Sequence, residues 1–273
     1  MMASITHWLA TGATLVSLAL APPAGAGAQD TSSRLASARD TANATVDPPR
    51  ALPFGAGEQL VYDVAVGGAK VGTGTMELLG ADTVRGHPTF HSLFTVKGGF
   101  LMFKVNDQLE SWFDQQTLNS LRFIQRINEI HYHKERYYEI YPDRAMLHQR
   151  GYDEMPSVSD PLDDGSFLYF VRTVPLVVGQ TYRFDRYFRP DRNPVIVKVL
   201  RKERITVPAG TFNTIVIQPI IKSQGIFADG GEAEMWLSDD DRRMMVQFKA
   251  RVPVLKTLDL YLTSYRPPTT AAQ

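Results

Sequence analysis

The feature that most constrains this chain is the alternation of apolar with polar or small residues along most of its length. The segment 60–66 alternates in this way, and Gly67-Gly68 follows at once. Successive side chains of a strand point to opposite faces, and two glycines supply the positive φ angles of a two-residue hairpin turn. The pattern therefore predicts an antiparallel hairpin at the start of the folded region.

Similar segments recur as far as residue 265, with turn signals between them such as Pro142-Asp143 and Pro208-Ala209-Gly210. Runs rich in Val, Ile, Tyr and Phe that end at such signals are typical of strands. Gly98-Gly99 is interpreted as a further turn, and 239–243 as an acidic-then-basic hairpin loop. The predicted strands are 60–66, 70–79, 90–96, 101–113, 118–127, 130–141, 145–149, 181–188, 194–205, 212–222, 232–238, 244–252 and 255–265.

One segment departs from this alternation, and it predicts a short central helix near 161–174. Asp160 suits the N-cap, Pro161 suits the first helical position, and Pro175 ends the helix. Phe167, Phe170, Val171 and Val174 have the spacing of one helix face.

Together these elements predict an all-β fold, mainly antiparallel. The sheet is expected to be strongly curved, or to form a barrel-like pair of half-sheets, around the helix near 161–174. A hydrophobic content of 44% is enough for a core. The chain has no cysteine, so it can hold no disulfide, no thiolate metal site and no cysteine nucleophile. Nor does it show the alternation of strands and helices of a nucleotide-binding fold.

The N-terminal part is interpreted as a targeting segment. Residues 1–28 contain no charged side chain, and the apolar run Trp8 to Ala21 leads to Ala26-Gly27-Ala28. This order is typical of a secretory signal peptide. A retained membrane anchor is the alternative, but the run is shorter than the roughly 20 residues that span a bilayer. We therefore expect an exported or periplasmic protein that is soluble after cleavage near Ala28, without a transmembrane span.

The expected organisation is a signal peptide at 1–28, a disordered tether at 29–52, one β-rich domain at 53–266 and a flexible tail at 267–273. The tether is rich in Ala, Ser, Thr and Asp and lacks apolar periodicity, and the tail begins with two prolines.

Three groups of residues stand out together: 57–64 with 72–74, then 163–172, and finally 207–212 with 235–243. In this order they resemble a family of exported Gram-negative envelope proteins, the domain-of-unknown-function 3108 family. The resemblance extends over roughly residues 53–266. It implies a mostly β fold and an envelope location, and it implies no catalytic residue.

A metal site is one hypothesis from the residues. His131, His133 and Glu135 lie at alternate positions of a predicted strand, so their side chains share one face. Imidazole and carboxylate groups bind zinc, iron or copper, and His148 on the returning strand could join them. The alternative is a solvated strand face in which these side chains pair across strands. No cofactor is predicted, but a divalent metal is possible.

A ligand site is the other hypothesis. Arginines alternate with aromatic residues between 182 and 192, a composition that suits an anionic head group. Phe100 and Met102 could line an apolar groove inside a curved sheet. The alternatives are a strand edge protected by charge, and an ordinary core. The predicted ligand-binding residues are Arg183, Arg186, Arg189, Tyr187, Phe100 and Met102.

These observations favour a non-enzymatic protein that binds an amphipathic envelope ligand, lipid or glycan, or a protein partner. Equal numbers of basic and acidic residues, 29 each, argue against a nucleic-acid partner. No serine-hydrolase motif of the G-x-S-x-G type is present. The alternative function is metal binding or metal-dependent catalysis at His131, His133 and Glu135, and a purely structural or assembly role also stays open.

Overall fold

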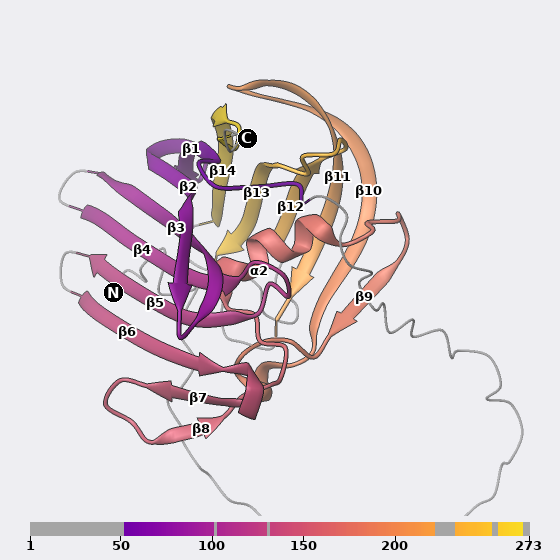
Figure 1. The fold of residues 1–273 in the computed structure, drawn as a ribbon. Helices are drawn as coiled ribbons and strands as arrows, with labels where there is room; N and C mark the ends of the chain where they lie inside the picture. The colour runs from indigo at the N-terminus through magenta and orange to yellow at the C-terminus, as the bar shows by residue number, and fades with distance from the viewer. Residues whose placement is uncertain (1–51, 101–102, 130–131, 222–232, 253–255, 270–273) are drawn as a thin grey trace, which may run out of the picture.

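The computed structural model describes residues 52–100, 103–129, 132–221, 233–252 and 256–269 (Figure 1). The N-terminal group of strands comprises β1 (Gln59–Val66), β2 (Ala69–Val84), β3 (His87–Phe100), β4 (Phe103–Asp114), β5 (Ser120–Glu129), β6 (Tyr132–Tyr141), β7 (Met146–Gln149) and β8 (Glu154–Pro156). The C-terminal group comprises β9 (Thr181–Phe184), β10 (Val195–Val207), β11 (Gly210–Ile220), β12 (Ala233–Ser238), β13 (Met245–Val252) and β14 (Lys256–Arg266).

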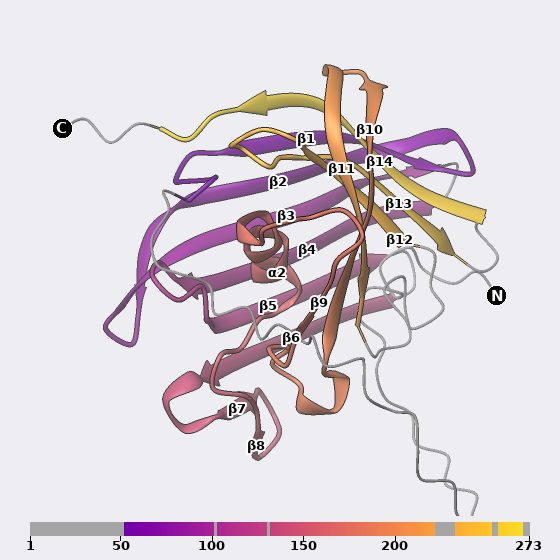
Figure 2. The same ribbon diagram turned by 90° about the vertical axis from the view of Figure 1, so that its right-hand side faces the viewer.

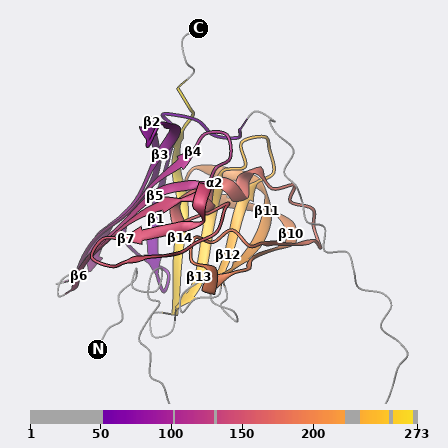
Figure 3. The ribbon, with the colours of Figure 1, turned by 60° about the horizontal axis from the view of Figure 1, so that its bottom comes forward.

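The described strands form one sheet in the order β8-β7-β6-β5-β4-β3-β2-β1-β14-β13-β12-β11-β10-β9, and every neighbouring pair is antiparallel. The sheet is open, because its edges β8 and β9 do not pair with each other. It bends so that the two groups of strands face one another as half-sheets (Figures 1 and 3). The prediction of a curved all-β fold is confirmed.

The short helix α2 (Asp164–Phe170) lies inside this curve, between the two half-sheets (Figure 2). Its aromatic residues join the inward-facing residues of both half-sheets in one continuous core. That core includes Tyr62 and Phe113 from the first half-sheet and Met235 and Leu260 from the second. The helix therefore fills the space that a closed barrel would fill with strand side chains.

The helix is shorter than predicted and starts later. Pro161 lies outside the helix, and Leu162 forms a parallel β-bridge with Tyr187. The N-cap is therefore Asp163 rather than Asp160: its carboxylate accepts hydrogen bonds from the Gly165 and Ser166 amides at 2.7 and 2.9 Å. The Ser166 hydroxyl accepts from the Asp163 amide, which completes a capping box. After Phe170 the chain continues as a 3₁₀ turn, Val171–Thr173.

A buried ion pair fixes the end of this helical segment. Arg172 donates to both carboxylate oxygens of Glu58, at 2.6 and 2.8 Å, and the two side chains are 0% and 1% exposed. The same guanidinium donates to the carbonyls of Pro53 and Arg242. It thereby joins the start of the described chain, the helix and the β12–β13 loop.

The glycine pairs have two different roles. Gly67 and Gly68 have φ angles of 57° and 86° and form the predicted β1–β2 turn. The prediction of a turn at Gly98-Gly99 is wrong, because both residues belong to β3. Gly98 lies opposite Gly72 of β2, and a Cβ on Gly98 would be 2.3 Å from the Val71 carbonyl oxygen. These glycines allow the two backbones to approach closely.

Other local differences concern the chain around the helix. The edge strand β8 was not predicted, and β9 ends at Phe184 rather than at residue 188. Two further 3₁₀ turns, Pro142–Arg144 and Pro190–Arg192, follow β6 and precede β10. Within the described ranges, neither α2 nor any of these turns has the length and apolar character that a bilayer crossing demands.

Candidate anion-binding pocket

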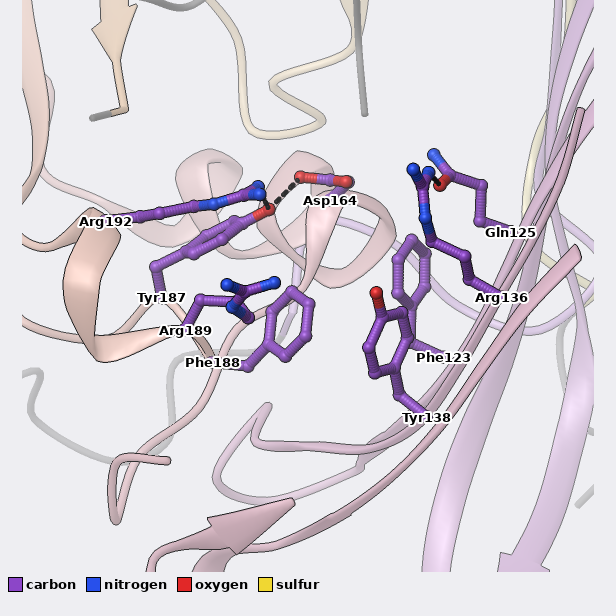
Figure 4. Close-up of a pocket in the computed structure, with 9 residues that line it drawn as sticks. All are labelled: Phe123, Gln125, Arg136, Tyr138, Asp164, Tyr187, Phe188, Arg189 and Arg192. Carbon is purple, nitrogen blue, oxygen red and sulfur yellow. Dashed lines mark hydrogen bonds between the residues drawn. The ribbon is translucent and has the colours of Figure 1, made fainter. Parts of the chain in front are cut away.

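A small pocket opens where the first half-sheet meets the chain that follows β9 (Figure 4). The space is small, shallow and partly open to solvent, so a ligand can place a small group at its mouth but cannot be enclosed as a whole. The lining residues come from β5 (Phe123 and Gln125), β6 (Arg136 and Tyr138), α2 (Asp164) and the segment 187–192 (Tyr187, Phe188, Arg189 and Arg192).

The segment 187–192 is held in place by backbone and side-chain hydrogen bonds. The Phe188 amide donates to the Leu162 carbonyl at 3.0 Å, and Asn193 bonds both to the amide and to the carbonyl of Tyr187. The Ser157 hydroxyl donates to the Phe188 carbonyl at 2.8 Å. This wall of the pocket is therefore fixed relative to the start of α2.

The pocket has an aromatic floor. Phe123, Tyr138 and Phe188 are buried and lie against one another, with ring centroids 5.2 to 6.0 Å apart. Tyr187 lies against Phe188 with a centroid distance of 5.0 Å. Such packed rings leave little conformational freedom, so they form a rigid support for the polar groups above them.

Three guanidinium groups surround the open space. Arg189 and Arg192 lie on one side of it and Arg136 on the other, with Asp164 between them (Figure 4). Arg136 donates to the Gln125 side-chain oxygen at 2.5 Å, and Arg192 to the Tyr187 hydroxyl at 3.3 Å. Within the described residues, neither Arg136 nor Arg192 has a carboxylate within ion-pair distance, although Arg192 is only 9% exposed. Arg189 has only a long contact, 3.4 Å, with the exposed carboxylate of Asp191.

The one carboxylate that lines the pocket, that of Asp164, is linked to Arg192 through the Tyr187 hydroxyl. Asp164 accepts a hydrogen bond from the Tyr187 hydroxyl at 2.9 Å. Burial raises the pKa of Asp164, while the bond from Tyr187 and the charges of Arg192 and Arg136 oppose that rise. Burial likewise raises the pKa of Tyr138, although Arg136, Arg189 and Arg192 act in the opposite direction. All three arginines are therefore electrostatically close to the Tyr138 hydroxyl.

Only two of the predicted ligand-binding residues, Arg189 and Tyr187, line this pocket. Arg183 is exposed on β9 and is not among the lining residues. Arg186 has a structural role: it donates to the carbonyls of Asp160 and Thr117 and to the Asn119 side chain. The side chain of Phe100, and Met102 as a whole, lie outside the described residues.

The carboxylates of the predicted metal site bind arginines instead. His131 lies outside the described residues, and His133 is exposed. Glu135 pairs with Arg126 at 3.3 Å. His148 lies opposite Glu139 on the neighbouring strand, but Glu139 accepts hydrogen bonds from Arg122, Arg85 and Tyr137. Across the described ranges, no group of three or more His, Asp and Glu side chains is placed to hold a metal.

Sequence reasoning missed the half of the pocket that β5 and β6 provide. Alternation along β6 places Arg136 on the same face as Tyr138 and Ile140, both of which are buried. Gln125 lies directly opposite Arg136 in the sheet register. Two basic residues, Lys134 and Arg136, precede Tyr138 and Ile140 on one face of β6, and this was the available signal.

A family model described as "Protein of unknown function (DUF3108)" matches residues 61–263. The chain belongs to the DUF3108 family. A search of curated proteins finds no match.

Among solved structures, this DUF3108 chain is similar to a beta-barrel-like protein of the DUF1849 family from Brucella abortus, with a TM-score of 0.53 and 10% identity. The match covers 80% of this chain and 100% of the other. At this identity the likeness concerns the fold alone. A candidate lipoprotein from Parabacteroides distasonis matches at a TM-score of 0.36 and 11% identity, covering 79% of this chain and 98% of that one.

The second of the three DUF3108-like segments now has a physical explanation. Asp163 caps the helix, and its second carboxylate oxygen accepts from the Ser111 hydroxyl at 2.6 Å. A Cβ on Gly165 would lie 2.9 Å from the Ser111 Cβ, so glycine lets the helix lie directly on β4. Asp164 is the residue of this segment that reaches the pocket.

Proposed function

We propose that this DUF3108 protein is a non-enzymatic, exported binding protein that holds the anionic group of an amphipathic envelope molecule, a lipid or a glycan, in the arginine pocket. The observation that carries the proposal is the set of arginines described above. Arg136 and Arg192 face one small space without a carboxylate within ion-pair distance in the described chain.

The physical reason is the cost of an unpaired charge. Removing a guanidinium from water costs several kcal/mol unless a counter-charge and hydrogen bonds replace the lost hydration. Arg172 meets this requirement within the protein, through Glu58. Arg192 is similarly buried, but its hydrogen bond goes to a neutral phenol. A bound anion would complete its coordination.

The proposed ligand binds as an amphiphile. The aromatic floor accepts the carbon next to the anionic group, while the bulk of the molecule extends through the open side of the pocket. The proposed location is the periplasm, with the soluble form produced by cleavage near Ala28. The support for export is the uncharged segment 1–28, with its apolar run and Ala26-Gly27-Ala28.

The full-length chain is expressed in a Gram-negative bacterium, and the protein is purified from the periplasm without detergent. Native mass spectrometry of this protein is the test. We expect a non-covalent additional mass that is lost on denaturation. The double variant Arg136→Gln/Arg192→Gln should lose it. Arg183→Gln is the control for loss of a positive charge, since it removes one guanidinium from an exposed position outside the pocket.

Two outcomes would overturn the proposal. The first is a bare polypeptide that also fails to bind added vesicles containing an anionic lipid, which would favour a protein partner or an assembly role. The second is an additional mass that persists in the double variant, which would place the ligand elsewhere on the protein. Circular dichroism of each variant confirms that it is folded before binding is compared.

A further inference from the structure

We infer that the group held by the pocket is a doubly charged tetrahedral anion of the phosphate-monoester type, rather than a carboxylate or a singly charged phosphodiester. This inference rests on the proposed function and specifies the chemistry of its ligand. It concerns the residues that line the pocket and needs no other part of the chain.

The first argument is charge. The pocket contains the guanidinium groups of Arg136, Arg189 and Arg192 and one carboxylate, that of Asp164. The other titratable groups that face it, Tyr138 and Tyr187, are neutral near pH 7, since the ordinary pKa of a phenol is about 10 and burial raises the pKa of both further. Asp191 is 64% exposed and interacts with Arg189 only weakly. The lining therefore has two positive charges in excess, which one dianion neutralises.

The second argument is direction. A carboxylate is planar, and one guanidinium can satisfy both of its oxygens side by side. Here Arg189 and Arg192 approach the space from one side and Arg136 approaches it from the other (Figure 4). A tetrahedral group presents oxygens toward each side at once, so it can accept from Arg136 and from Arg192 simultaneously.

The third argument is the net attraction. Asp164 borders the same space, and its carboxylate is held there by the Tyr187 hydroxyl. Its repulsion of an anion and the attraction of the arginines both grow in proportion to the charge of the ligand. Because three arginines outweigh one carboxylate, the net attraction is about twice as large for a dianion as for a monoanion, and this difference favours phosphate monoesters over carboxylates.

The experiment compares three aromatic probes by isothermal titration calorimetry on the mature protein at pH 8 and constant ionic strength. Phenyl phosphate is a tetrahedral dianion at this pH, since the second pKa of a phosphate monoester is about 6. Benzenesulfonate is a tetrahedral monoanion, and benzoate is a planar monoanion. We expect phenyl phosphate to bind about tenfold more tightly than either of the others.

The variants assign this preference to the pocket. Arg136→Gln should reduce the preference for phenyl phosphate severalfold, and Arg192→Gln should do the same if it folds. Arg183→Gln should leave the preference unchanged. At pH 5, where phenyl phosphate is mostly a monoanion, its advantage over benzenesulfonate should largely disappear. Asp164→Asn should retain the preference for phenyl phosphate at pH 8, and it should lower the dissociation constants of all three probes.

Failure of the inference differs from failure of the proposed function. If benzoate or benzenesulfonate binds as tightly as phenyl phosphate, and Arg136→Gln weakens the binding of all of them equally, the pocket binds anions without preferring a phosphate monoester. That result overturns the inference but not the proposed function. If none of the three probes binds, the proposed function fails as well. A preference that Arg136→Gln does not alter overturns the assignment to this site.

The source of the monoester is decided by a second comparison. Vesicles with phosphatidic acid carry a lipid monoester, vesicles with phosphatidylglycerol carry a diester, and glycerol phosphate is a soluble monoester. Preferential sedimentation with phosphatidic acid vesicles supports a lipid-borne group. Tight binding of glycerol phosphate without sedimentation supports a soluble phosphorylated compound. Equal sedimentation with both kinds of vesicle contradicts the inference.

Discussion

Arg172 and Glu58 illustrate how much one buried charge contributes at the scale of the residue. Their side chains are almost wholly buried and bond through two oxygens, and Arg172 also serves two backbone carbonyls. Removing either partner leaves the other charge buried without compensation. By contrast, Arg144 and Glu154 form an exposed pair of similar chemistry near the sheet edge.

We expect Glu58→Gln to lower the free energy of unfolding by about 3–5 kcal/mol, since Arg172 then loses its counter-charge. Glu154→Gln is the matched control, with an expected loss below about 1 kcal/mol for an exposed pair. Urea denaturation followed by fluorescence measures both. Equal losses in the two variants would contradict the structural role of the buried pair.

Asp163 makes stability depend on pH. Burial raises the pKa of Asp163 to about 6, whereas an unfolded aspartate titrates near 4. Between these values the folded state retains a proton that the unfolded state releases, so stability falls as pH rises from about 4 to about 6. The total change is about 3 kcal/mol.

We expect Asp163→Asn to lack this fall, because asparagine does not titrate. Its side-chain oxygen can still accept from the Gly165 and Ser166 amides, and its amide can donate to the Ser111 hydroxyl. The measurement is the difference in unfolding free energy between wild type and variant at pH 4, 5, 6 and 7. A difference that stays constant over this range would show that Asp163 has an ordinary pKa.

At the scale of the element, the pairing of β2 with β3 depends on glycines that lie opposite each other. A Cβ on Gly98 would be 2.6 Å from the Gly72 Cα, closer than carbon atoms can approach. Gly80 of β2 has no atom within 4 Å of the same position and no positive φ. These two glycines provide a comparison within one hairpin.

Gly98→Ala should therefore lower the free energy of unfolding by about 1–3 kcal/mol, the usual cost of overpacking. Gly80→Ala should be neutral or slightly stabilising, because it reduces only the freedom of the unfolded chain. Thermal denaturation of the two variants checks the prediction. If both behave alike, close backbone approach is not what requires glycine at residue 98.

Local sequence signals predict the elements correctly where a residue type has a single structural role. Gly67-Gly68 and Pro208-Ala209 do connect strands. The turn predicted at Gly98-Gly99 is wrong because glycine occurs both in turns and where two backbones approach closely. Only the position of the neighbouring strand distinguishes these two roles. The helix start was placed at Asp160 rather than Asp163 because both precede suitable residues, and the choice depends on the distant pairing of Leu162 with Tyr187.

The candidate site could be predicted from the sequence only where its residues lie close together along the chain. Arg189 and Tyr187 were found because they lie in one short basic and aromatic segment. Arg136 was missed because it joins them only when β6 is brought beside residues 187–192, a contact between distant parts of the chain. The role of Arg186 depends on its bonds to residues 117, 119 and 160, which no local pattern contains.

At the scale of the whole molecule, the two half-sheets are joined through the pairing of β1 with β14. The first and last strands of the described chain therefore lie side by side in the middle of the sheet. The core beneath them is continuous and includes Leu60, Tyr62, Leu260 and Leu262. Neither half-sheet can complete its buried face without the other.

We expect a chain that ends at residue 255 to lack cooperative unfolding, although it retains thirteen of the fourteen described strands. Loss of β14 uncovers the facing edges of β1 and β13 and exposes the core between them. A chain that ends at residue 266 is the control and should unfold in one transition. Calorimetry distinguishes the two cases, and a sharp transition in the shorter chain would mean that one half-sheet folds alone.

The position of β14 also limits the order in which the sheet can form. β1 ends at residue 66 and β14 begins at residue 256, so the inner edge of β1 has no partner until residues 256–266 have been synthesised. Hairpins such as β2–β3 can form before then, but the seam between the half-sheets cannot. A nascent chain that lacks these residues therefore exposes an unpaired strand edge in the middle of the future sheet, and it has to be protected from aggregation until β14 emerges.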